Sequence, residues 1–238
     1  VEDIPDKELI QAYLRSLASE CSKLSLGVVD PRFVEKSRED SISLSSIYID
    51  LDVQHSIDEE KVKKQETELF LERERQNRLP VLEALNDSKL HRFVLLGYPC
   101  SWKTTFLHYI SYSFCLAAQE EPEAKQLLPE DWKLSKHFPV RLILRDVAAQ
   151  HISADAQKGN ADMIWNALQA DLVMRVGDEI AKTLFPKLQQ FIIKNPCLVL
   201  LDGLDEVTES DGRRWGLIVT IYRFFTLLKN DAGVLVTA

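Results

Sequence analysis

The sequence predicts an α/β fold of three layers, in which helices cover both faces of a mostly parallel central sheet. Three short apolar runs carry this prediction: residues 91–96, 198–201 and 233–238. Each run has the length of a buried strand, and segments with helical spacing lie between them along the chain. This alternation of strands and helices is typical of a parallel sheet that is covered on both faces.

The N-terminal residues predict a helical lead-in and an approach strand. Residues 4–23 have a helical pattern, residues 24–40 form a mixed polar loop, and residues 41–53 alternate apolar and polar side chains as a strand does. Residues 58–78 are dense in charge, with opposite charges at i, i+4 spacing, so we expect a solvated helix or helical linker. A docking surface for another protein is the alternative for this segment.

A possible phosphate-binding loop follows the first predicted strand of the sheet. In the segment GYPCSWKTT, Gly97, Lys103 and Thr104 keep the spacing of G-x-x-x-x-G-K-[ST]. Backbone N–H groups of such a loop hold phosphates, while the lysine and the hydroxyl reach phosphate and magnesium. Residues 104–119 have helical spacing, so a helix N-terminus would face the anion. An ordinary strand-to-helix turn is the alternative interpretation.

Two positions of this loop depart from the pattern. Trp102 stands where glycine precedes the lysine, and Cys100 stands where a middle glycine is common. Glycine permits a positive φ and a close approach of the main chain to a ligand, which tryptophan and cysteine do not supply at low cost. We therefore expect nucleotide binding to be weakened or lost.

The connection from this loop to the next strand, and the helices beyond it, can be predicted from punctuation and periodicity. Residues 120–136 are polar and contain prolines, which indicates a surface connection. Residues 163–176 and 179–193 have helical patterns. Residues 215–228 are apolar at most positions, so we expect a helix covered on several sides, with an exposed partner interface as the alternative.

A second segment, CLVLLDGLDEV, places carboxylates at the end of a predicted strand. The run 198–201 ends at Asp202, and the carboxyl ends of strands are where open α/β sheets bind ligands. Asp202 is therefore the natural partner for magnesium. Asp205 and Glu206 add two more carboxylates, whose mutual repulsion requires a compensating cation or a role in positioning water. A solvated acidic turn is the alternative.

The run LVLLDGLDEV is similar to the extended Walker B motif of NACHT domains, within the STAND class of P-loop signalling ATPases. Other stretches resemble bacterial members of that family in the same order: a lead-in at residues 9–31, an approach strand at 43–53, a strand between the Walker motifs at 138–148 and the start of the sensor strand at 233–238. The family loop usually reads G-x-P-G-S-G-K-[ST]-T, which is matched here by Pro99, Ser101, Lys103, Thr104 and Thr105 but not by Cys100 and Trp102.

The resemblance implies a three-layer P-loop NTPase with an ASCE/AAA-like strand order, in which residues 233–238 lie between the two Walker strands. It also implies three parts: a helical lead-in and approach strand at 1–57, a charged linker at 58–90, and a NACHT core at 91–238 that is incomplete at its C-terminal end. We expect further domains to flank this piece.

The resemblance also implies roles for the site residues. Residues expected to contact ATP are Gly97, Pro99, Ser101, Trp102, Lys103, Thr104 and Thr105. Thr104 and Asp202 would hold Mg²⁺, and Asp205 or Glu206 would position water. The expected function is a signalling switch, serving defence or regulation in bacterial relatives, with weak ATP binding and slow or absent hydrolysis. The alternatives are a non-hydrolysing interaction scaffold and, less favoured, a small-molecule or nucleotide kinase.

Composition limits the partners. The chain has 238 residues, 45% of them hydrophobic, which is enough to bury a sizeable core. A net charge of −8 disfavours a general nucleic-acid surface, and no apolar run has the length of a membrane span. The four cysteines are scattered and indicate neither a zinc site nor a disulfide framework, so we expect a cytoplasmic protein. The histidines have no partner at metal-ligand spacing, so we expect them to be hydrogen-bonded or on the surface. Nucleotide, and self-association or protein partners through flanking domains, are the expected partners.

Overall fold

The computed structural model describes residues 6–24, 42–43, 52–54, 78–87, 92–98, 102–129, 132, 136–152, 159–208, 212–229 and 231–238. Within these ranges, no helix combines the length and the apolar character needed to cross a membrane. The expected polar loop at 24–40, the strand-like run at 41–53 and the charged segment at 58–78 lie outside the described residues, apart from a few residues at their ends.

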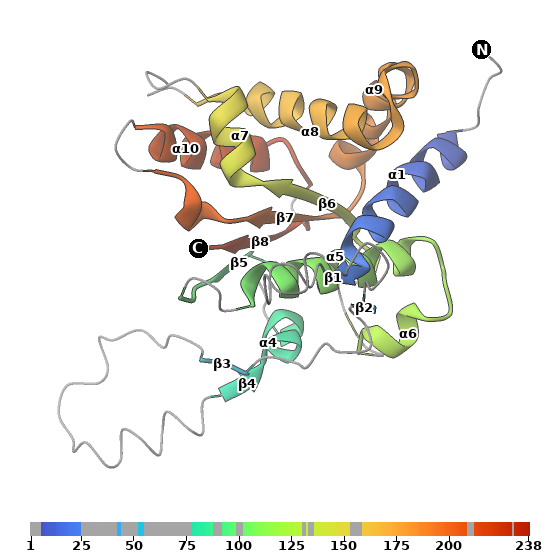
Figure 1. The fold of residues 1–238 in the computed structure, drawn as a ribbon, viewed down its shortest axis with the longest axis vertical. Helices are drawn as coiled ribbons and strands as arrows, with labels where there is room; N and C mark the ends of the chain where they lie inside the picture. Colours follow the sequence, from blue (N-terminus) through green and yellow to red (C-terminus); the bar gives the residue numbers. More distant parts are fainter. Residues whose placement is uncertain are drawn as a thin grey trace, which may run out of the picture.

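A four-stranded parallel sheet forms the centre of the fold (Figure 1). In spatial order its strands are β5 (Arg92–Leu95), β8 (Gly233–Thr237), β7 (Cys197–Asp202) and β6 (Phe138–Ile143). All neighbouring pairs in this order are parallel. The predictions of an α/β class and of a last strand that lies between the strands of the two motifs are confirmed.

The strands of this sheet differ in burial, and one expectation about them is wrong. β7 is buried at every position, as a strand in a parallel sheet should be. The sequence predicts that β5 is buried too, but Val94 and Leu96 are 62% and 74% exposed. β5 lies at the end of the described sheet, where only Phe93 and Leu95 pack against the core. An apolar run of this length cannot tell an end strand from a central one.

Helices flank the sheet on both faces (Figure 1). One layer contains α4 (Val81–Asp87), α5 (Lys103–Ala118) and α6 (Ala124–Leu127), and the other contains α7 (Leu144–His151), α8 (Ala161–Val176), α9 (Asp178–Lys194) and α10 (Arg213–Phe225). Two short antiparallel pairs complete the described strands: β1 (Lys23–Leu24) with β2 (Ile42–Ser43), and β3 (Asp52–Gln54) with β4 (Arg78–Pro80).

Helix α1 (Asp6–Cys21) belongs to the same core as the sheet. It contacts α5 in one layer and α8 and α9 in the other. Tyr13 of α1 stacks on Phe138 at the start of β6, with ring centroids 5.6 Å apart. The N-terminal helix is therefore held against the sheet by a buried aromatic contact, and the rings of Tyr13 and Phe138 both lie in the larger core cluster.

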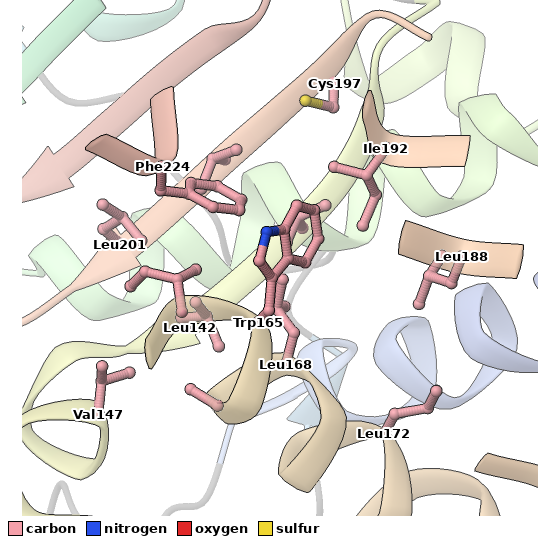
Figure 2. Close-up of a cluster of buried hydrophobic side chains, with 14 of the residues drawn as sticks. Leu142, Val147, Trp165, Leu168, Leu172, Leu188, Ile192, Cys197, Leu201 and Phe224 are labelled. Atoms are coloured by element: carbon pink, nitrogen blue, oxygen red, sulfur yellow. The ribbon is translucent and has the colours of Figure 1, made fainter. Parts of the chain in front are cut away.

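The larger core lies between the sheet and the layer formed by α7 to α10 (Figure 2). Trp165 of α8 packs edge-on against Phe224 of α10, with ring centroids 4.8 Å apart. Leu142 of β6 and Leu201 of β7 reach the same cluster. A second cluster, around Phe106 of α5, covers the opposite face of the sheet. These two cores confirm helical layers on both faces.

The helices predicted at 4–23, 104–119, 163–176 and 179–193 are confirmed as α1, α5, α8 and α9. The predicted surface connection at 120–136 is wrong in part, because it contains α6 and buries Trp132, which is 3% exposed. Trp132 packs edge-on against Phe114, at 5.7 Å between ring centroids. The expectation that α10 is covered on several sides is also wrong, because Trp215 and Tyr222 are 64% and 70% exposed.

Candidate functional site

The candidate phosphate loop leaves β5 and enters α5. Pro99, Cys100 and Ser101 lie outside the described residues, and both ends of the loop are described. At its start, Gly97 N donates to Ala238 O at 3.2 Å, and Ala238 N donates to Leu95 O at 3.1 Å. The end of β8 therefore fixes where the loop begins.

At the end of the loop, Trp102 adopts a left-handed backbone conformation, with φ 65° and ψ 8°. This conformation costs a residue other than glycine about 1–2 kcal/mol. Its carbonyl accepts from Phe106 N at 2.8 Å, so α5 begins directly after it. The chain thus keeps a backbone geometry that glycine would adopt freely, although a tryptophan occupies the position. The residue is 56% exposed.

Lys103, the first residue of α5, folds back across the loop. Its Nζ donates to Gly97 O at 2.5 Å and to Tyr98 O at 3.3 Å. It also forms an ion pair of 3.2 Å with Asp205 Oδ2, 102 residues later in the sequence. Lys103 is only 9% exposed. Because it pairs with Asp205, it connects the candidate phosphate loop to the acidic segment.

Asp202 ends β7 and is 5% exposed. Its Oδ1 accepts from Thr104 Oγ1 at 3.2 Å and from Thr237 Oγ1 at 2.9 Å. Its Oδ2 faces Arg141 Nη2 at 3.4 Å. Thr237 Oγ1 also accepts from the buried Gly203 N at 2.8 Å, so one hydroxyl fixes both the carboxylate and the turn that follows it.

The 3₁₀ turn η4 (Leu204–Glu206) carries the other two acidic residues. Asp205 pairs with Lys103, and Glu206 Oε2 accepts from Arg145 Nη1 at 2.9 Å. The Arg145 and Glu206 side chains are 60% and 47% exposed, so this second pair is weak. Each carboxylate of the candidate site therefore has its own cationic partner, and these side chains compensate the repulsion among the three acidic groups.

The described residues fit a bound Mg²⁺. The Thr104 hydroxyl and the Asp202 Oδ1 atom are 3.2 Å apart. Adjacent ligands of an octahedral Mg²⁺ are about 3 Å apart, because its bonds are about 2.0–2.1 Å long. Within the described ranges, no three or more His, Cys, Asp or Glu side chains are placed so that they could hold a metal ion together. A magnesium ion held jointly with phosphates needs only one or two protein carboxylates.

A chain of ion pairs extends from Asp202 away from the loop. Arg141 pairs with Glu20 at 2.8 Å, and Glu20 pairs with Arg175 at 2.6 Å. Arg175 reaches Asp171 through two contacts, of 2.7 and 3.0 Å. Burial alone would raise the pKa of the Glu20 carboxyl, but Arg175 and Arg141 together lower it below its ordinary value. The chain therefore alternates in charge from the sheet to helices α1 and α8.

A cavity of about 740 Å³ lies beside this chain, and its lining includes Glu20, Arg141, Asp171 and Arg175. The lining does not include the loop or the acidic turn.

His108 of α5 also lies near the chain of ion pairs. Burial, reinforced by Arg141, lowers the pKa of His108 to about 4. The histidine is therefore neutral at pH 7.

Sequence reasoning found Lys103, Thr104, Asp202 and Asp205, and the structure brings all four together. Gly97 and Trp102 lie at the two ends of the loop, Thr105 lies in the first turn of α5, and Glu206 is turned toward Arg145. Sequence reasoning missed the residues that neutralise and orient the acidic groups: Arg141, Arg145, Thr237 and Glu20. Arg141 offered a signal, since it is a charged residue within an otherwise apolar strand.

The expectation that histidines are hydrogen-bonded or on the surface is confirmed for His137, whose Nε2 donates to Asp231 O at 2.8 Å. Comparison of the chain with protein-family models, with curated proteins and with solved structures finds no match in any of the three.

Proposed function

We propose that this chain is the nucleotide-binding part of a NACHT-type signalling switch of the STAND class, with weak binding of ATP and Mg²⁺ and slow or absent hydrolysis. The observation that carries the proposal is the joint placement of Lys103 with Asp205 and of Thr104 with Asp202. These four residues come from two segments whose spacing resembles the Walker motifs.

The topology supports the proposal as well. β8 lies between β5, which leads into the loop, and β7, which ends at Asp202. This is the order that the resemblance implies for P-loop NTPases of this kind. Both candidate segments follow the carboxyl ends of parallel strands, where ligands of open α/β sheets bind.

The residues of the site have distinct tasks in this proposal. The N–H groups of Lys103, Thr104 and Thr105, at the start of α5, precede the first i→i−4 bond of the helix and can bind phosphate oxygens. Lys103 would exchange its contacts with Gly97 O and Asp205 for phosphate oxygens, and Thr104 and Asp202 would hold Mg²⁺. When bound, the ion would neutralise phosphate charge.

The same contacts support weak binding and slow hydrolysis. Lys103 must give up an ion pair with Asp205 and a bond to Gly97 O before it can reach a phosphate. Asp205 and Glu206, which would orient water, are both engaged with cations. Trp102 weakens the site further, because a residue other than glycine pays about 1–2 kcal/mol to hold the left-handed conformation at this end of the loop.

Calorimetric titration with Mg-ATP and with ADP tests the proposal. We expect weak binding by the native chain and a loss of roughly tenfold or more in Lys103→Ala, because a charge-assisted hydrogen bond contributes about 1.5–3 kcal/mol. Lys125→Ala, a change of an exposed lysine on α6, is the matched control and should bind like the native chain. Equal binding by the native chain and Lys103→Ala would contradict the proposal.

A scaffold without nucleotide chemistry is the second candidate. The observation that favours it is the closed set of ion pairs, in which Lys103, Asp205 and Glu206 already satisfy one another or Arg145. Under this alternative the native chain binds no nucleotide, whereas Trp102→Gly, which frees the loop, does. The same titration therefore separates a working site from a blocked one.

A further inference from the structure

Arg141 is buried beside the candidate magnesium ligand. It lies in the middle of β6, and its side chain is 3% exposed. Nη2 lies 3.4 Å from Asp202 Oδ2, and Nη1 donates to Glu20 Oε1 at 2.8 Å. A buried guanidinium requires acceptors on several sides, because removing its charge from water is expensive. Asp202 and Glu20 each supply one, at different nitrogens of the guanidinium.

The two oxygens of Asp202 have separate partners. Oδ1 accepts from Thr104 and Thr237, whereas Oδ2 faces Arg141. These contacts on both oxygens fix the rotation of the carboxylate. As a result, the oxygen that is presented to Thr104, the other expected magnesium ligand, is always Oδ1.

Stability alone does not explain Arg141. Its Nε is buried and has no hydrogen-bond partner among the described residues. A buried donor left unpaired costs about 1–3 kcal/mol, and replacing a buried ion pair by apolar groups is often neutral or stabilising. An apolar residue would also suit a strand in which the other positions are mostly buried and apolar. The contact with Asp202, rather than packing, therefore explains why an arginine occupies this position.

We infer that Arg141 is a positioning residue for Asp202, and that Glu20 of helix α1 holds Arg141 in place. This inference rests on the proposed function. Groups that hold a metal ligand in orientation typically change metal affinity by roughly 10- to 100-fold when they are lost. The N-terminal helix thereby contributes to the magnesium site, although no residue of it touches Thr104 or Asp202 in the described contacts.

Glu20 is suited to this task because its carboxylate is held at both oxygens. Oε1 binds Arg141, and Oε2 binds Arg175 at 2.6 Å. Arg175 is held in turn by Asp171 through its two contacts. Loss of the Glu20 charge leaves Asp202 as the only ion-pair partner of Arg141 among the described residues, so the guanidinium can shift toward Asp202.

The first test compares ATP affinity with and without Mg²⁺ in the native chain, Arg141→Met and Glu20→Gln. The enhancement by Mg²⁺ is the ratio of ATP affinity with Mg²⁺ to ATP affinity without it. We expect this ratio to fall roughly 10- to 100-fold in Arg141→Met and less in Glu20→Gln. ATP affinity without Mg²⁺ should stay unchanged in both variants. Glu8→Gln, an exposed change on the same helix, is the control and should behave as the native chain.

Two outcomes of this test would overturn the inference. If Arg141 merely competes with the ion, removing its charge raises the enhancement by Mg²⁺ or leaves it unchanged. If Arg141 is merely structural, affinities with and without Mg²⁺ fall in the same proportion. Absence of ATP binding in the native chain would instead contradict the proposed function itself.

A second measurement needs no nucleotide. Gly203 N donates to Thr237 Oγ1, which donates to Asp202, so exchange of the Gly203 amide proton reports how firmly Asp202 is held. We expect NMR to show faster exchange at Gly203 in Arg141→Met, with amides of α9 unchanged. Unchanged exchange at Gly203, or faster exchange throughout the chain, would overturn the inference even if no nucleotide binds.

Discussion

Thr237→Val tests the account of how Asp202 is held. Thr237 is fully buried, and its hydroxyl donates to Asp202 Oδ1 at 2.9 Å while it accepts from Gly203 N at 2.8 Å. Valine has nearly the same shape, so the substitution opens no cavity. It removes both hydrogen bonds and leaves the buried Gly203 N–H without an acceptor.

The magnitude follows from these two losses. A hydrogen bond to a charged group contributes about 1.5–3 kcal/mol, and an unpaired buried donor costs about 1–3 kcal/mol. The added methyl group recovers about 1 kcal/mol through burial. We therefore expect Thr237→Val to lower the free energy of unfolding by about 3 kcal/mol.

Urea unfolding at pH 7, with the transition slopes compared, is the assay. Thr220→Val is the matched control, because Thr220 is equally buried but its hydroxyl has only a weak contact of 3.6 Å with Met163 Sδ. The control should change stability by less than about 1 kcal/mol. Equal destabilisation by the two substitutions would refute the reasoning.

Three further substitutions test other contacts. Glu120→Gly should raise the free energy of unfolding by about 1 kcal/mol, because Glu120, two residues after the end of α5, has a left-handed φ of 60°; Glu121→Gly should give no gain in urea unfolding. Arg175→Met should lower the free energy of unfolding by about 3 kcal/mol, because Asp171 loses its partner and Glu20 keeps only Arg141. Lys182→Met, at an exposed pair, should leave it nearly unchanged, and equal effects of the two substitutions would contradict the burial argument. The folded pKa of His108, about 4, lies below its ordinary value of 6.5, so its stabilisation is complete above pH 6.5 and is lost as the pH falls toward 4. As the pH falls from 6.5 toward 4, His108→Gln should therefore lose less thermal stability than the native chain does. Thermal unfolding at several pH values tests this, and parallel stability profiles of the two proteins would contradict the lowered pKa of His108.

The elements of the central sheet could be predicted because their signals are local. The run at 198–201 is apolar throughout and is followed by an acidic residue, and the structure places β7 and Asp202 there. The helix after the loop has apolar residues at helical spacing, and α5 begins at Lys103. The contact between Lys103 and the acidic segment could also be predicted from the motifs, because each motif follows the carboxyl end of a parallel strand in the same sheet.

The cations of the site could not be predicted, because their partners depend on which strands are neighbours. Arg141 meets Asp202 only because β6 lies beside β7 and α1 closes the other side. The exposure of Trp215 on α10 and of Val94 on β5 depends in the same way on what covers each element. Periodicity reports which residues can share a face and does not report what lies against that face.

The most direct test of the central claim is the effect of Mg²⁺ on ATP affinity in the native chain and in Thr104→Val. Thr104 is exposed, so its replacement should leave the fold intact. We predict that Mg²⁺ tightens ATP binding by the native chain and that most of this effect is lost in Thr104→Val, because the Thr104 hydroxyl and Asp202 Oδ1 are spaced as adjacent magnesium ligands. ATP binding that ignores Mg²⁺ in the native chain, or an equal Mg²⁺ effect in both proteins, would contradict the assignment of this site.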